Sequence, residues 1–131
     1  MAFDFEEFLD VADGLMRINK WSEGYCRSAV SRAFYAVWHE AKDYLNTNRG
    51  LQQVYKRDGV VAEFQKHRDA KVRALGGLLE DLNTRRNEAD YKLSGQLVGP
   101  IFTPEQTELD VKKARDLIDD IKQVRMRLPQ F

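Results

Sequence analysis

The sequence has too few cysteines for an internal disulfide and no apolar run long enough for a membrane-spanning helix. Its one cysteine, Cys26, cannot form a disulfide within the chain, which indicates a reducing compartment. No run approaches the roughly 20 apolar residues that a membrane-spanning helix requires. We therefore expect a soluble, cytoplasmic protein that does not bind a membrane.

Several kinds of chemistry lack their usual residues. The two histidines, His39 and His67, lie 28 positions apart, and with a single cysteine they form no metal-ligand spacing. The sequence also has no Gly-x-x-x-x-Gly-Lys phosphate loop and no Gly-x-Ser-x-Gly nucleophile motif. A formal net charge of zero excludes a bulk electrostatic attraction to nucleic acid. We expect no metal and no cofactor.

What the sequence does have is helical periodicity along most of its length. A chain of 131 residues is the size of one domain, so we expect a single domain over residues 1–131. Apolar residues recur at helical spacing, and no alternating strand pattern of convincing length is present. The first predicted helix begins at Asp4 and has an apolar face that reaches Met16, and the others begin near Ser22, after Gly59, near Asp69 and at Thr103. These others end near Leu45, His67, Leu93 and Pro129. The prediction is an all-α fold: an antiparallel bundle of four main helices plus one short helix.

The segments between these helices read as turns and loops. Residues 46–50 (Asn-Thr-Asn-Arg-Gly) carry turn chemistry and should end the second helix, and residues 51–58 and 94–102 should be loops. Thr103, Pro104 and Gln106 form a strong helix start, with a capping threonine, a proline at the first helical position and a glutamine at the capping-box position. Gly76 and Gly77, inside the long helix, mark either a weak point or a close approach of another helix.

Two polar groups of residues stand out on the predicted helices. The long helix places Arg86 and Asp90, four residues apart, on an otherwise apolar stripe (Leu75, Leu79, Leu82, Ala89, Leu93). The second helix lines up a polar stripe of Ser28, Arg32, Tyr35 and His39. Charges on an apolar face must be paired if they are buried. His67, between Lys66 and Arg68, is expected at the surface.

Three segments carry a resemblance to a known family. Residues 31–39 read Ser-Arg-Ala-Phe-Tyr-Ala-Val-Trp-His, residues 58–64 read Asp-Gly-Val-Val-Ala-Glu-Phe, and residues 86–91 read Arg-Asn-Glu-Ala-Asp-Tyr. In this order and spacing they resemble the HEPN family, in particular the branch with an Arg-x-x-Ala-Asp-Tyr motif. The last helix, with its Thr-Pro-Glu-Gln start, is also similar to the family's final helix.

The resemblance implies a helical bundle that forms a homodimer. Many HEPN proteins are paired with a minimal nucleotidyltransferase in toxin–antitoxin systems, and others are metal-independent ribonucleases of defence systems. Their catalytic motif is an arginine and a histidine with four to six residues between them, and two copies of it meet across the dimer. In this sequence no histidine follows Arg86 at that spacing, whereas Arg32 and His39 fit it on the second helix.

Two interpretations of these residues remain open. The Arg86–Asp90 pair either fixes helix packing or a dimer interface, or Arg86 holds a phosphate with its planar fork while Asp90 orients it. The polar stripe either forms a satisfied network between helices or binds a phosphate and exchanges a proton. The candidate catalytic residues are thus Arg86, Asp90, Tyr91 and His39, and the candidate ligand-binding residues are Ser28, Arg32 and Tyr35.

Three functions follow from these interpretations. The first is a HEPN-like protein that binds nucleotide or RNA and a protein partner, in a toxin–antitoxin or defence system. The second is a ribonuclease toxin in which Arg86 stabilises the charged phosphorane and His39 or Tyr91 moves the proton. The third is a structural subunit that pairs helices. The first is favoured because the histidine is missing after Arg86.

Overall fold

The chain folds into helices only, over the part that the structure describes. A computed structural model describes residues 7–18, 23–48 and 57–127. The helices are α1 (Glu7–Ile18), α2 (Glu23–Asn48), α3 (Arg57–Gln65), α4 (Ala70–Tyr91) and α5 (Pro104–Arg127), with a 3₁₀ turn η1 (Ser94–Gln96) between the last two. The predicted all-α bundle of four main helices and one short helix is therefore confirmed.

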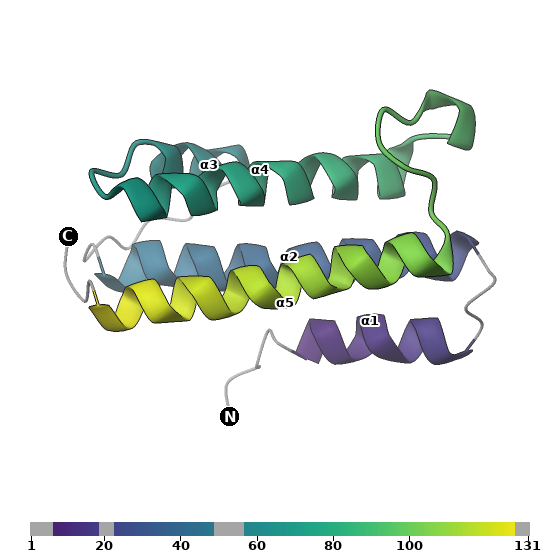
Figure 1. Cartoon of the computed structure of the whole chain (residues 1–131), viewed down its shortest axis with the longest axis horizontal. Coiled ribbons are helices and arrows are strands. Elements are labelled where there is room, and N and C mark those ends of the chain that lie inside the picture. Colours follow the sequence, from purple (N-terminus) through teal and green to yellow (C-terminus); the bar gives the residue numbers. More distant parts are fainter. Residues whose placement is uncertain (1–6, 19–22, 49–56, 128–131) are drawn as a thin grey trace.

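The helices stack in three layers (Figure 1). The helices α2 and α5 form the middle layer, α1 lies on one side of it, and α4 with α3 lies on the other. Both long pairs, α2 with α5 and α4 with α5, run alongside each other for most of their length. None of the described helices combines the length and apolar character needed to cross a membrane.

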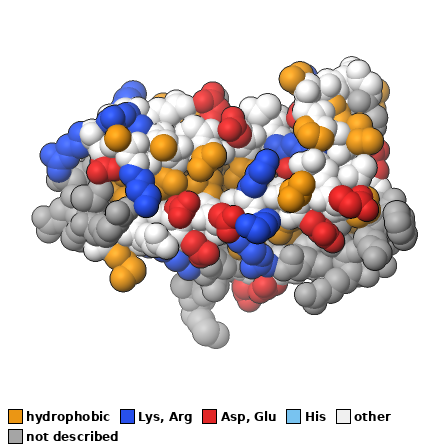
Figure 2. All heavy atoms as spheres, in the orientation of Figure 1, with side chains coloured by type: hydrophobic (Ala, Val, Ile, Leu, Met, Phe, Trp, Pro, Cys, Tyr) orange, Lys and Arg blue, Asp and Glu red, His pale blue; other side chains and the backbone are white. Residues whose placement is uncertain are grey.

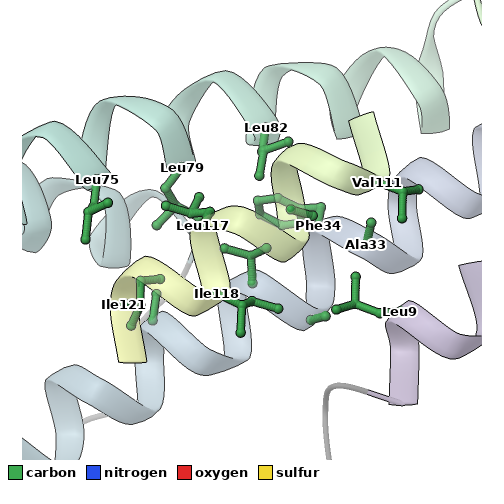
Figure 3. Packing of buried hydrophobic residues seen from close by; sticks show 14 of the residues in the cluster. Leu9, Ala33, Phe34, Leu75, Leu79, Leu82, Val111, Leu117, Ile118 and Ile121 are labelled. Carbon is green, nitrogen blue, oxygen red and sulfur yellow. The ribbon is translucent and has the colours of Figure 1, made fainter. Parts of the chain in front are cut away.

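The core lies where α2, α4 and α5 meet. Figure 3 shows Leu75, Leu79 and Leu82 of α4 facing Leu117, Ile118 and Ile121 of α5, with Phe34 of α2 beside them. These side chains are buried, and each contributes about 1.5–3 kcal/mol by leaving water. The apolar stripes predicted for these three helices therefore form one continuous core.

Local capping begins α4 and α5 where the sequence predicts. The side chain of Asp69 accepts hydrogen bonds from the backbone N–H groups of Lys71 and Val72, at 2.9 and 3.2 Å. The hydroxyl of Thr103 accepts one from the N–H of Gln106 at 3.1 Å. The second half of the predicted capping box is not formed, because the backbone N–H of Thr103 donates to the carbonyl of Ile101 at 3.0 Å and the side chain of Gln106 donates to Asp110 at 3.2 Å.

Two helix boundaries around residues 46–58 differ from their predicted positions. The turn predicted at residues 46–50 is wrong in part, because α2 continues to Asn48. Arg125 of α5 pairs with Glu40 and Asp43 at 3.5 and 3.2 Å, and these pairs hold the last turns of α2 against α5. The predicted loop 51–58 is also wrong at its end, since α3 begins at Arg57; its other residues lie outside the described ones.

The end of α4 is set by an arginine from another helix. Leu93 was expected on the apolar stripe, but α4 ends at Tyr91 and Leu93 is exposed. Nη1 of Arg27 on α2 donates to the carbonyl oxygens of Glu88, Ala89 and Lys92, at 2.8, 3.2 and 2.6 Å. The carbonyl of Glu88 also accepts the backbone N–H of Lys92 at 3.1 Å, so Arg27 adds a second donor there and supplies one to the Ala89 and Lys92 carbonyls at the helix end.

Two further expectations meet different outcomes. His67 is buried rather than at the surface, because its Nδ1 accepts the backbone N–H of Asp69 at 2.9 Å in the turn before α4. Gly76 marks a close approach: a Cβ there would lie 2.9 Å from Cβ of Phe64 on α3. Gly77, in contrast, has no such neighbour within 4 Å. The predicted start of the first helix at Asp4 lies outside the described residues.

Candidate functional site

Arg86 lies inside the molecule, between α4 and α2. The residue is only 2% exposed. Its Nη1 contacts Oδ2 of Asp90 at 3.3 Å and its Nη2 contacts Oδ1 of Asn83 at 3.2 Å. The guanidinium carbon lies 5.6 Å from the ring centre of Phe34, which is cation–π geometry. Two polar side chains and an aromatic face therefore compensate the Nη groups of this buried cation, whereas its Nε has no hydrogen-bond partner among the described residues.

Asp90, the partner of Arg86, lies at the surface. Its side chain is 28% exposed, so only Arg86 of the predicted pair points inward. The hydroxyl of Ser31 on α2 donates to the same Oδ2 at 3.4 Å. The carboxylate thus joins α4 to α2 at the rim, next to Tyr91, which is 73% exposed and whose ring lies 5.9 Å from the Arg86 guanidinium. Ser31 was part of the motif but was not among the predicted site residues.

The polar stripe predicted on α2 lies partly on the side of α1, away from Arg86. Ser28 and Arg32 are exposed, while Tyr35 and His39 are half-buried. Arg32 and His39 both lie near the Phe8 ring of α1, with separations of 5.9 and 6.1 Å to the ring centre. Tyr35 contacts Phe34 edge-on at 5.5 Å. The structure therefore brings Arg86, Asp90 and Tyr91 together with Ser31, and it places Arg32 with His39 on the side of α1.

His39 favours its neutral form. Burial lowers the pKa of its imidazole below the ordinary 6.5, and the positive charge of Lys42 lowers it further. At neutral pH the ring is thus a proton acceptor rather than a cation. It can accept a proton from a ligand, but it adds no charge for binding a phosphate.

A second buried ionic cluster was not predicted. Nε of Arg85 donates to Oδ2 of Asp110 at 2.9 Å, and Nη1 of Arg85 lies 3.8 Å from Oε1 of Glu88. Arg85 also donates to the carbonyls of Pro100 and Ile101, and its guanidinium lies 3.8 Å from the ring centre of Phe102. All three charged side chains are buried. This cluster holds the segment before α5 against α4.

The loop between α4 and α5 depends on Glu88. Its Oε2 accepts hydrogen bonds from the backbone N–H groups of Val98 and Gly99, at 2.6 and 3.1 Å. A Cβ at position 99 would lie 2.9 Å from Oε1 of Glu88, so a larger residue there would displace this carboxylate. The sequence offers one local signal, the i,i+3 spacing of Arg85 and Glu88; the pairing with Asp110, 25 positions away, has none.

A cleft lies beside this cluster, between α4 and α5. Its volume is about 520 Å³. It is lined by apolar, acidic and basic side chains from both helices and by residues 98–100 of the loop. Within the described ranges no three His, Cys, Asp or Glu side chains gather in a way that could hold a metal ion.

Comparison with known protein families and with curated proteins identifies no relative of this chain. The sequence matches no protein-family model, and a search of curated proteins finds no similar chain.

Proposed function

We propose that this chain is a HEPN-like module that binds RNA or a nucleotide on the face where α2 meets α4, and that it works with a protein partner in a toxin–antitoxin or defence system. The observation that carries the proposal is the buried Arg86, which holds the surface carboxylate of Asp90 at 3.3 Å beside Ser31. A buried cation on an apolar stripe is costly, and in this proposal it orients the carboxylate of Asp90 at the surface.

The chemistry at this rim suits a ribonucleotide. Asp90 can accept a hydrogen bond from a ribose hydroxyl, the group that distinguishes RNA from DNA. The exposed ring of Tyr91 offers a stacking surface for a base, and the exposed Lys92 beside it in the chain offers a cation for a phosphate. Arg86, being buried, acts in this proposal through Asp90 and not on the ligand.

The test is a titration of the ¹⁵N-labelled protein with AMP, a short oligoadenylate RNA and the matching DNA. We expect the amide signals of Ser31, Asp90 and Tyr91 to shift with RNA. Asp90→Asn should weaken RNA binding about tenfold and bring it close to DNA binding, because a charged acceptor for the 2′-hydroxyl is lost.

Asp116→Asn is the matched control. Asp116 also forms an i,i+4 pair, with Lys112 at 3.0 Å, but it lies on α5 and is exposed. Its replacement should leave RNA binding unchanged. If saturating RNA and nucleotide leave the signals of Ser31, Asp90 and Tyr91 in place, the proposed site does not exist.

A ribonuclease toxin is the second candidate, favoured by the lowered pKa of His39. A neutral imidazole can take the proton of a 2′-hydroxyl, and Arg32, at the spacing of the family motif, lies near the same Phe8 ring. This candidate predicts RNA cleavage without added metal that His39→Ala and Arg32→Ala abolish. Intact RNA after long incubation with the purified protein would exclude it.

The resemblance also implies a homodimer and a minimal nucleotidyltransferase as partner. Both are part of the proposal. Sedimentation of the purified chain, alone and with such a partner, tests them separately from the RNA site.

A further inference from the structure

The cleft between α4 and α5 has the shape of a groove. Its walls run along α4 from Leu78 to Glu88 and along α5 from Gln106 to Asp120. At 1.5 Å per residue these walls are about 15 and 21 Å long, which corresponds to three or four turns of a helix. Residues 98–100 border the groove near its Glu88 end.

The groove exposes apolar surface. Leu78 is 49% exposed, although it lies on the helix that supplies much of the core. Leu82 and Leu117, which line the groove more deeply, are buried. Figure 2 shows hydrophobic side chains along the middle of this face, between α4 and α5, with charged side chains on either side. A linear apolar groove between two helices is the geometry that receives the apolar face of a third helix.

The rim of the groove carries a small excess of negative charge. Outside the buried cluster of Arg85, Glu88 and Asp110, the lining has three carboxylates (Asp81, Asp116, Asp120) and one cation (Lys113), and Asp116 pairs with Lys112 at 3.0 Å. The chain as a whole has no net charge, so this excess is local. Among the described residues Asp81 and Asp120 form no ion pair within 4 Å, and they lie on opposite walls. Both are therefore available to a cationic ligand.

We propose that this groove binds a basic amphipathic helix of a partner protein. The apolar face of the helix would cover Leu78 and Leu82, and its Lys or Arg side chains would reach Asp81 on one wall and Asp120 on the other. A second copy of the same chain is a poorer occupant, because it brings the same carboxylates and no net positive charge. The groove is separate from the RNA site, so the two proposals stand or fail independently.

The probe is a fluorescein-labelled peptide of about 16 residues, with leucines at three- and four-residue intervals and lysines elsewhere. Fluorescence anisotropy should show saturable binding that weakens from 50 to 300 mM salt, since the contacts at the rim are screened. The amide signals of Leu78, Leu82 and Leu117 should shift. Leu78→Glu should weaken binding at least tenfold, and Asp81→Lys combined with Asp120→Lys should do the same.

Val11→Glu is the matched control, because Val11 is 46% exposed on α1, on the other side of the middle layer. It should leave peptide binding unchanged. Three results would overturn the proposal: equal binding of a peptide with glutamate in place of lysine, equal loss of binding in Val11→Glu, or shifts of the groove signals with a small aliphatic amine but not with the peptide. Self-association that Leu78→Glu abolishes, without peptide binding, would overturn it in favour of a second copy.

Discussion

Arg85 and Arg86 are neighbours in the sequence, yet their side chains lie in different environments. Successive residues of a helix point about 100° apart, so Arg86 faces Phe34 of α2 while Arg85 faces Asp110 of α5. Each is buried, and each is paired. The same residue type thus supports the candidate RNA face on one side of α4 and closes the loop before α5 on the other.

The Arg85–Asp110 pair should be the most sensitive ion pair that the structure describes. Asp110→Ala should lower the free energy of unfolding by about 3–5 kcal/mol, because it leaves the Arg85 guanidinium buried without its nearest carboxylate. Asp116→Ala, which removes an exposed carboxylate from the same helix, should change it by less than about 1 kcal/mol. Urea denaturation measures both. Equal changes in the free energy of unfolding would mean that burial does not set the contribution of the Arg85–Asp110 pair to stability.

His39 gives the stability a defined pH dependence. Its pKa in the folded protein is below 6.5, so the folded state binds fewer protons than the unfolded state just below that pH. Stability should therefore rise with pH through the window between the lowered pKa and 6.5, and fall as the solution is acidified through it.

Titration of the imidazole protons by NMR measures the pKa directly. Lys42→Gln should raise it only part of the way to 6.5, because burial is the larger cause. In His39→Gln the contribution of this residue to the pH dependence should disappear. A pKa at or above 6.5 in the folded protein would contradict the environment described for this ring.

At the scale of the helix, the adjacent glycines Gly76 and Gly77 of α4 lie in different packing environments, so their replacement by alanine should have opposite effects on stability. Gly76→Ala should destabilise the fold by about 1–3 kcal/mol, since the new Cβ would meet Phe64 and the backbone nitrogen of Gln65 at 2.9 and 3.1 Å. Gly77→Ala should stabilise it by about 0.5–1 kcal/mol, because alanine favours the helix and meets nothing there.

Thermal unfolding of the two variants checks this pair. The change in composition is the same in both, so any difference in sign comes from the packing of α3 on α4. If both substitutions stabilise the protein, α3 can move away from α4 at little cost.

Across the whole molecule, α4 separates two surfaces with different chemistry. Its contact with α2 carries a buried cation, an exposed tyrosine and a polar rim, whereas its gap with α5 is apolar with an acidic border. We propose a ribonucleotide as the ligand of the first surface and a basic helix as the ligand of the second. Because the two surfaces lie on different sides of α4, the two proposals do not compete for the same residues.

The candidate site was predictable in its parts and less so in its arrangement. The four-residue spacing brought Arg86 and Asp90 together, as expected from the helix alone. The sequence did not indicate that Asp90 would meet Ser31, or that Arg32 and His39 would lie near Phe8 of α1. Those contacts depend on how far each helix is rotated about its axis, which no short-range pattern records.

The sequence by itself determined the helices, their buried faces and the caps at Asp69 and Thr103, because periodicity and capping act over a few neighbouring residues. The tertiary structure decided where α2 and α4 end, which carboxylate pairs with Arg85, and that α4 and α5 leave a groove. These features arise between residues far apart in the chain, where the energy depends on the relative placement of whole helices.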